Sequence, residues 1–456
     1  MKLTRRQALV GAAAGAAGVG GIYELVEQLT GGSPQRTVAG GGRPEQHLLD
    51  GIRIVRSDEI EVLVPPLHHE ILTARVTADR PGLRDAQGEL EHLLSGLEGD
   101  YPPSPAGLGV TVAWGLPYFH RLVPGQAARR LPHDRRANRP VLLDAIRFQS
   151  DPGDTRLEAN DVAILLRSDL RGHIDDATKR IRDSQLFTLT SIRRGFAGGG
   201  FDGARSLPKQ MALAAGVPGA DLIPDTSELF LGFTSTQRAG MGPGTIANFE
   251  TLGYVDFRGN DYFRHGTHMH LSHIHEDLEA WYLNFDFDER VATAFRPNLN
   301  VKQGTQTVRQ GPKDVSTDAD VHRDYRSSGR IGHSAAIQTT SRLDRDVVAV
   351  DGTVYPKGTA IPVRADFNTL DNPFAWSVRP DEIGATPAAG VHFVVFNPTS
   401  DDFHRNRRAM DGVFPGGKIA FKPRAREQGF NEVLSTTHRQ NFLVPPRRHR
   451  SFPLVL

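Results

Sequence analysis

Hydrophobic positions in the first half of the chain follow a regular order of strand-like and helix-like segments. The strand-like segments alternate apolar and polar residues or form short apolar runs, whereas the helix-like segments repeat apolar residues at helical spacing. The expected strands are residues 70–76, 108–114, 162–167 and 186–192, and the expected helices are 83–97 and 170–181. A Pro- and Arg-rich loop separates the second strand from the third. This order predicts a split βαβ, ferredoxin-like unit.

The second half of the chain shows a looser version of the same plan. Strands are expected at residues 265–275, 359–364 and 391–396, and helices at 278–285 and 401–410, the last with Ser400 or Thr399 able to cap it. The polar stretch 298–328 has no clear periodicity, which is typical of a functional or loosely ordered insertion. We therefore predict an α+β protein with two ferredoxin-like halves and antiparallel sheets, of the dimeric α/β-barrel type.

The N-terminus has the pattern of an export signal. Arg5 and Arg6 precede a weakly apolar Gly/Ala-rich stretch that runs to Ile22, and adjacent arginines before such a stretch favour the twin-arginine route. A plain amphipathic helix is the alternative. We expect residues 1–30 to be the signal and 31–50 a flexible linker, with an N-terminal domain over 51–245 and a C-terminal domain over 246–456. The expected location is the periplasm, the cell envelope or the extracellular space.

Composition removes several classes of function. The chain has 456 residues, enough for a large core, and its formal charge of +1 gives no argument for a nucleic-acid partner. It has no cysteine, which excludes disulfides, thiolate metal sites, iron–sulfur clusters and cysteine nucleophiles. Any metal must therefore use histidine or other nitrogen and oxygen ligands. The basic run at 445–450 is expected to be a solvated tail.

A glycine-rich loop at residues 193–203 carries one carboxylate, Asp202, directly after an expected strand. Gly198, Gly200 and Gly203 fit the dinucleotide-binding spacing G-x-G-x-x-G. That fingerprint needs parallel βαβ repeats and a helix that opens at the loop, whereas here the surrounding pattern is split and Pro208 follows closely. The loop is better interpreted as a mount for a carboxylate used in proton transfer or cation contact.

Five histidines fall between His265 and His275. On a strand, His268 and His270 share one face, and His273 and His275 share the other. Pairs of imidazoles at this spacing can chelate zinc or copper, which makes His268 and His270 candidate metal ligands. The alternative is a set of neutral, hydrogen-bonded histidines that line a cavity or a barrel interior.

Several segments, in order along the chain, resemble one enzyme family. Gly199, Asp202 and Gly203 also form the pattern G-x-x-D-G. The other segments are residues 161–166, 228–233, 268–281, 362–368 and 390–396, followed by Phe403. Together with the export signal and the two halves, they resemble the dye-decolourising peroxidases, haem enzymes often exported by the twin-arginine route.

The resemblance implies a set of site residues and partners. Asp202 would be the distal acid and base that moves a proton between the oxygens of hydrogen peroxide, and Arg364 would stabilise charge. The implied cofactor is haem b, and the residues expected beside it are Gly199, Phe201, Gly203 and Asn368. The partners would be hydrogen peroxide, an unidentified reducing substrate and the twin-arginine export machinery, and a homo-oligomer is also allowed.

The axial iron ligand is where the sequence departs from the family pattern. The family carries a histidine in a segment like A-H-I-R, and direct superposition puts Ala336 at that position. His333 lies three residues earlier and shares a helix face with Ala336, so it is the candidate ligand of the haem iron. Two alternatives stay open: a non-catalytic exported relative that has lost haem and binds another ligand, and a non-haem metalloprotein that uses the 265–275 histidines.

Overall fold

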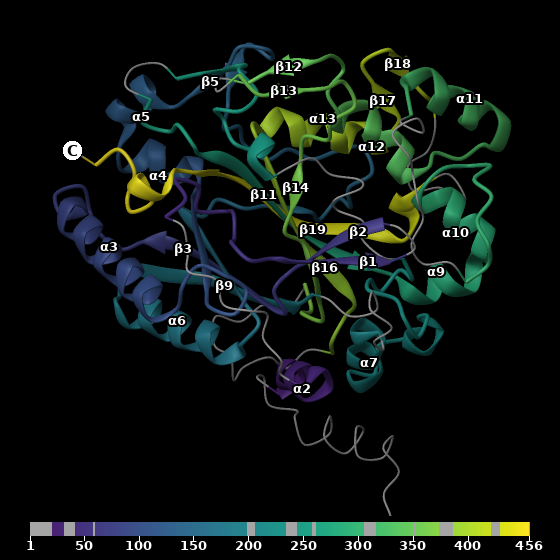
Figure 1. Cartoon of the computed structure of the whole chain (residues 1–456), viewed down its shortest axis with the longest axis horizontal. Helices are drawn as coiled ribbons and strands as arrows, with labels where there is room; N and C mark the ends of the chain where they lie inside the picture. Colours follow the sequence, from purple (N-terminus) through teal and green to yellow (C-terminus); the bar gives the residue numbers. More distant parts are fainter. Residues whose placement is uncertain are drawn as a thin grey trace, which may run out of the picture.

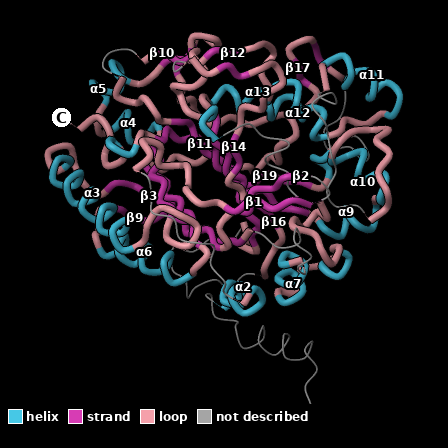
Figure 2. The backbone as a smooth tube through the Cα atoms, in the orientation of Figure 1, coloured by secondary structure: helices cyan, strands magenta, loops and turns pink. Residues whose placement is uncertain are grey.

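The computed structural model describes residues 21–31, 42–57, 60–197, 206–233, 244–257, 261–304, 316–349, 352–373, 386–420 and 429–455. Strands occupy the middle of the molecule and helices lie around them (Figures 1 and 2). This arrangement is an α+β fold with antiparallel sheets, as predicted.

The N-terminal half forms the predicted split unit. Its elements are β3 (His68–Val76), α3 (Leu83–Asp100), β4 (Gly109–Trp114), β8 (Val162–Ser168), α6 (Arg171–Asp183) and β9 (Phe187–Phe196). The strands pair antiparallel in the order β9-β3-β8-β4. Leucines and isoleucines on α3 and α6 are buried against this sheet, which confirms the helical periodicity of the sequence.

The C-terminal half repeats the plan. Its elements are β11 (Thr267–Glu276), β14 (Val363–Arg364), β15 (Phe367–Thr369), β16 (Gly390–Asn397), α13 (Ser400–Met410) and β19 (Leu434–Val444). The strands pair antiparallel in the order β15-β16-β11-β19, and β14 pairs with another part of β16. Thr399 is the residue that caps α13, through a capping box with Asp402.

The two half-sheets close into one barrel within the single chain. Asn368 of β15 pairs with Phe196 of β9, and Leu443 of β19 pairs with Trp114 of β4. Closure leaves neither half-sheet with an open edge at these junctions. It also places Phe196, the last residue of β9, beside Asn368. The glycines of the loop follow β9 in the sequence.

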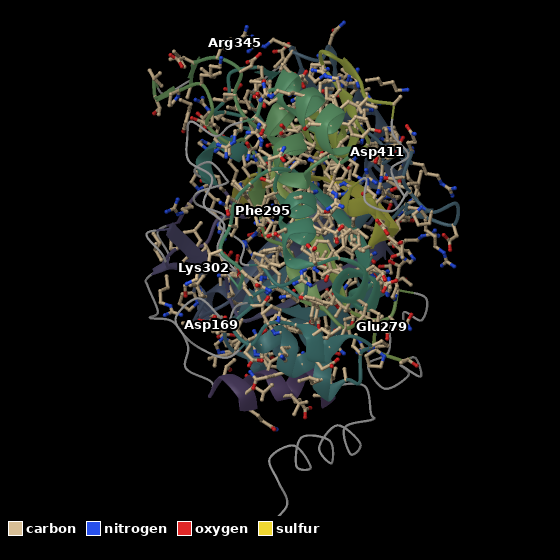
Figure 3. The ribbon with its side chains drawn as sticks, turned by 90° about the vertical axis from the view of Figure 1, so that its right-hand side faces the viewer. Asp169, Glu279, Phe295, Lys302, Arg345 and Asp411 are labelled. Atoms are coloured by element: carbon tan, nitrogen blue, oxygen red, sulfur yellow. The ribbon has the colours of Figure 1, made fainter. Side chains whose placement is uncertain are left out.

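The remaining helices and strands decorate the barrel. The helices are α2 (Gly21–Thr30), α4 (Leu116–Arg121), α5 (Pro124–Arg130), α7 (Leu207–Ala214), α9 (Leu278–Asn284), α10 (Phe287–Ala294), α11 (Asp318–Ser328) and α12 (His333–Ser341). The short strands are β1 (Arg53–Ser57), β2 (Ile60–Val64), β5 (His133–Asp134), β6 (Arg139–Pro140), β7 (Arg156–Leu157), β10 (Val255–Asp256), β12 (Val347–Val348), β13 (Val354–Tyr355), β17 (Val413–Phe414) and β18 (Gly417–Lys418). Helix α13 packs on β11 and β16, and α12 packs on α13 and α10. The side of the molecule formed by α9 to α12 faces the viewer in Figure 3.

A row of buried histidines crosses the barrel interior. His273 of β11 lies directly opposite His392 of β16 and His438 of β19. His273 continues the face of β11 that carries the apolar interior residues Met269 and Leu271. His392 and His438 lie beside it on the neighbouring strands. Burial holds the pKa of His273 and His392 well below its usual value, so both are neutral. His273 is therefore a neutral histidine that lines the barrel interior.

The N-terminal segments are more ordered than their composition suggests. Tyr23 and Val26 of α2 are buried, and the Tyr23 hydroxyl donates a hydrogen bond to Asp371 Oδ1 at 2.7 Å. The expected signal thus overlaps a packed helix over residues 21–30. Residues 42–50, expected to be flexible linker, are also docked: the Gln46 side chain bonds the backbone N–H and C=O of Val112. The linker prediction is wrong for that part. Within the described ranges, no helix combines the length and apolar character needed to span a membrane.

The basic C-terminal run is not a solvated tail. The Arg450 side chain is 3% exposed and pairs with Glu91 at 2.9 Å and with Glu98 at 2.5 Å, both on α3. The ring of Phe452 packs on Trp114 with ring centroids 5.1 Å apart. Charge alone predicted exposure, but the glutamates of α3 neutralise the arginine and let this segment cover the N-terminal core.

Candidate functional site

The glycine-rich loop expected at 193–203 is described only up to Ala197, and residues 193–196 belong to β9, so the strand extends further than expected. Residues 198–205 contain four predicted site residues, Gly199, Phe201, Asp202 and Gly203. Immediately before them, Ala197 is buried and its N–H donates to the Leu67 carbonyl at 2.9 Å. The predicted roles of these four residues stay predictions.

Arg364 and Asp366 lie at the β14–β15 edge of the C-terminal half. Arg364 pairs with Val395 of β16, and its Nε lies 3.7 Å from Asp366 Oδ1. Asn368, two residues further on, is buried and its Nδ2 donates to the Glu228 carbonyl at 3.2 Å. This hydrogen bond links the segment after α7 to the junction between the two half-sheets.

His333 is the first residue of α12 and lies half-buried beside an aromatic pair. Its ring contacts Phe430 with centroids 5.1 Å apart, and Phe430 stacks on Trp281 of α9 at 5.3 Å. The preceding residue, Gly332, is needed for close packing, because a Cβ there would come within 2.4 Å of the Phe295 carbonyl oxygen. Ala336, at the position the family pattern would give to the ligand, is buried in a separate apolar cluster with Val321.

The electrostatic surroundings keep His333 neutral. Burial, with smaller contributions from the Arg364 and Arg407 guanidinium groups, lowers its pKa to about 4. Its Nδ1 is buried and has no hydrogen-bond partner among the described groups. A neutral imidazole with an unsatisfied ring nitrogen is the form that binds a metal ion. The Arg364 guanidinium is therefore close enough to His333 to affect its pKa.

Glu276 is a buried acid that sequence reasoning missed. It ends β11, it is 8% exposed, and its Oε2 has no hydrogen-bond partner among the described residues. Burial, assisted by the negative charge of Asp366, raises its pKa to about 8, so it carries a proton at neutral pH. Its position directly after His275 is the sequence feature that could have marked it as a candidate.

His268 and His270 share one face of β11, as predicted, and this face is covered by α13. Both are fully buried and both have a lowered pKa, with burial as the main cause. Hydrogen-bond contacts engage both ring nitrogens of His270, Nδ1 with Asn441 Oδ1 at 2.7 Å and Nε2 with Ser272 Oγ at 2.6 Å. Among the described residues, no group of three or more His, Asp or Glu side chains is arranged to hold a metal ion. The metal-site hypothesis has no third ligand in this part of the chain.

The chemistry available at the site follows from these groups. His333 offers a neutral nitrogen ligand, Arg364 offers a fixed positive charge, and Glu276 offers a proton beside Asp366. Proton transfer and charge stabilisation are the two tasks that such a set performs. Glu276, Asp366 and Arg407 were not identified from the sequence as members of the site.

Comparisons with known proteins agree with this architecture. A family model described as a family of unknown function, DUF7405, matches residues 66–446. No curated protein matches the sequence. Among solved structures, the DyP-type peroxidase from Cellulomonas bogoriensis aligns with a TM-score of 0.51 and 17% identity, covering 87% of this chain and 95% of the other. The encapsulated DyP-type peroxidase from Mycobacterium smegmatis aligns with a TM-score of 0.50 and 14% identity, covering 85% and 95%. The chain belongs to the DUF7405 family and has the fold of the DyP-type peroxidases.

Proposed function

We propose that this protein is a haem-dependent peroxidase of the dye-decolourising type, which reduces hydrogen peroxide and oxidises an organic donor. The observation that carries the proposal is the neutral imidazole of His333, whose pKa the nearby Arg364 helps to lower, in a fold shared with DyP-type peroxidases. Bound haem would supply the iron at which peroxide is reduced.

The imidazole of His333 would hold the iron of a bound haem. Its buried Nδ1 has no hydrogen-bond partner among the described groups, and leaving such an atom unsatisfied costs free energy unless a ligand completes it. Its pKa of about 4 keeps the ring neutral and available for coordination at neutral pH. The His333 ring packs edge-on against Phe430, which in turn stacks on Trp281.

Proton and charge handling would fall to the other site residues. We assign the distal acid and base to Asp202 and the stabilisation of developing negative charge to Arg364. The Asp366 carboxylate lies 3.7 Å from Arg364 Nε and would partly balance its charge. Glu276 is protonated at neutral pH and would serve as a local proton source.

Haem binding by purified protein tests the proposal. The full chain is produced with a haem precursor in the medium, and its Soret absorption is compared with that of His333→Ala and of His92→Ala, a change at an exposed histidine of α3. We expect the wild type and His92→Ala to bind haem and His333→Ala to lose it, with partial recovery when imidazole is added. A haem-free wild type would instead support a relative that has lost the cofactor.

Peroxide kinetics test the catalytic assignments. Asp202→Asn and Arg364→Leu should retain haem and slow the reaction with hydrogen peroxide by about 10²-fold or more. The matched control for arginine is Arg345→Leu, which changes an exposed residue and should leave the rate unchanged. Rates equal to wild type in both site variants would remove these two roles.

Export by the twin-arginine route is a second part of the proposal. It rests on Arg5 and Arg6 and on the apolar stretch after them. Because α2 packs on the folded protein from Tyr23 onward, we place any cleavage before Gly21. Cell fractionation of the full chain and of an Arg5→Lys, Arg6→Lys variant tests this, and retention of export in the variant would contradict the route.

A further inference from the structure

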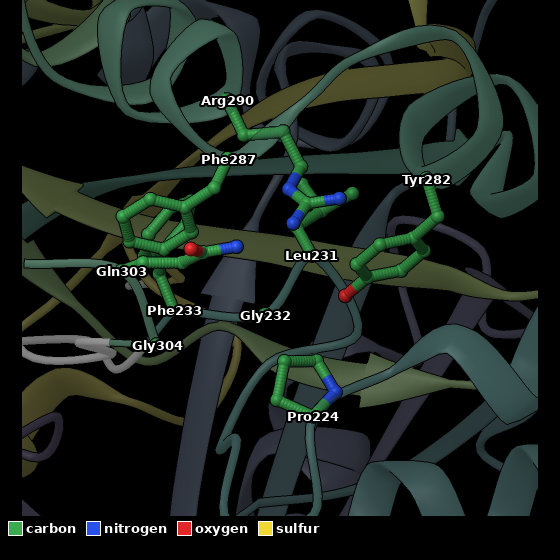
Figure 4. Close-up of a pocket in the computed structure, with 9 residues that line it drawn as sticks. All are labelled: Pro224, Leu231, Gly232, Phe233, Tyr282, Phe287, Arg290, Gln303 and Gly304. Atoms are coloured by element: carbon green, nitrogen blue, oxygen red, sulfur yellow. The ribbon is translucent and has the colours of Figure 1, made fainter.

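A separate pocket lies between α9, α10 and the segment that follows the 3₁₀ turn Ala220–Leu222. Its volume is about 180 Å³. The walls are formed largely by the rings of Phe233, Phe287 and Tyr282 (Figure 4). Gln303 and Arg290 supply the polar groups, and the Arg290 guanidinium points into the space between the rings.

Arg290 is a cation whose charge is poorly balanced by its surroundings. Its Cζ lies 5.0 Å from the centre of the Tyr282 ring, and its Nη1 donates a long hydrogen bond of 3.4 Å to the Phe285 carbonyl. No carboxylate of the described residues forms an ion pair with it. Partial burial lowers its pKa, and this effect outweighs the opposing influence of Tyr282 and of the Asp286 carboxylate. A guanidinium in this condition favours an incoming carboxylate, which it can bind through two parallel hydrogen bonds.

The shape of the pocket is held by the backbone and by the tyrosine. The Tyr282 hydroxyl donates to the Phe230 carbonyl at 2.6 Å, which fixes the ring against the following loop. Gly232 has a φ of +88°, and a Cβ there would lie 2.9 Å from the Tyr282 hydroxyl oxygen. A larger residue at this position would therefore displace the Tyr282 ring.

We propose that this pocket binds a small monocyclic aromatic carboxylate, with its ring against Phe233 and Phe287 and its carboxylate on Arg290. A cavity of about 150 Å³ is large enough to hold benzene, so 180 Å³ accepts one six-membered ring with a short substituent. The Gln303 amide can donate to the second carboxylate oxygen or to a ring hydroxyl. The site goes beyond the proposed peroxidase function and does not require haem.

Titration calorimetry of the full, haem-free chain with benzoate tests the inference. We expect a dissociation constant on the order of 1 mM or below. Benzamide, which has the same shape without the charge, should bind at least about tenfold more weakly, since a charge-assisted hydrogen bond contributes roughly 1.5–3 kcal/mol. 1-Naphthoate should gain little affinity over benzoate, because its second ring does not fit within 180 Å³.

Variants separate the site from general surface binding. Arg290→Leu should weaken benzoate binding at least about tenfold. Gly232→Val should also weaken it, because the new side chain would displace the Tyr282 ring. Arg290→Lys keeps the charge without the two-pronged geometry and should be intermediate. Arg84→Leu removes an exposed arginine on α3 and should bind as wild type does.

Three results would overturn the inference. They are no heat of binding in the wild type, equal binding of benzamide and benzoate, and unchanged binding by an Arg290→Leu protein whose circular dichroism and thermal midpoint match the wild type. Because every arm uses haem-free protein, failure here leaves the peroxidase proposal intact, and failure of haem binding leaves this site intact.

Discussion

Replacing Glu276 by glutamine should change how the stability of the folded protein depends on pH. The carboxyl has a pKa of about 8 in the folded protein, compared with the ordinary value of 4.5. Between these values the unfolded chain releases a proton that the folded protein keeps. The free energy of unfolding therefore falls by about 1.4 kcal/mol for each pH unit as the pH rises through this window, and the stability is lower above it. The glutamine variant lacks this group and loses no stability through it.

The magnitude follows from the width of the window. A shift of 3.5 units, from 4.5 to 8, corresponds to about 5 kcal/mol. Relative to wild type, the free energy of unfolding of Glu276→Gln should rise by up to this amount between pH 4.5 and pH 8. The buried histidines titrate in both proteins, so their contribution cancels in the difference.

Urea denaturation at half-unit pH steps measures this difference. Glu279→Gln on α9 is the matched control, because Glu279 is exposed, and its difference from wild type should be flat across the window. A flat difference for Glu276→Gln as well would show that the carboxyl titrates normally. That result would remove the argument that Glu276 stores a proton beside Asp366 and Arg364.

Three other predictions follow from the packing. Burial holds the pKa of His47 and His268 at about 3, and of His333 at about 4, so unfolding takes up protons below pH 6.5. The free energy of unfolding should therefore fall by more than about 1.4 kcal/mol per unit from pH 6.5 to pH 4, and a shallower slope in urea titrations would contradict this. Tyr23→Phe should cost about 1–3 kcal/mol, because it removes the hydrogen bond to Asp371; no loss in chemical denaturation would mean that α2 is not docked in solution. Arg450→Ala should cost about 2 kcal/mol, discounted for the partial exposure of its glutamate partners, and an unchanged thermal midpoint would argue against the docked C-terminal segment.

The sequence predicted the ferredoxin-like halves well because local patterns determine them. Leu90, Leu94 and Leu97 of α3 are buried, as their helical spacing requires. Closure of the barrel could not be predicted, because the hydrophobic pattern did not identify strand β19. Its inward and outward faces both carry polar residues, such as His438 and Arg439, that are buried by tertiary contacts alone.

Electrostatic features of the site were the hardest to predict. His333 and Arg364 were named from the resemblance, and the structure brings them within electrostatic reach. Glu276 and Asp366 are far apart in sequence and influence one another only after folding. The helix α11 was missed because its apolar face is narrow; a capping box at Thr317 and Asp320 starts it instead.

The central claim is that His333 provides the axial ligand of a haem. Its most direct test is the visible spectrum of haem-reconstituted wild type and His333→Ala, before and after addition of imidazole. The claim predicts a Soret band in the wild type, its loss in the variant and its return with imidazole. An identical haem spectrum in both proteins, or no haem in the wild type, would contradict it.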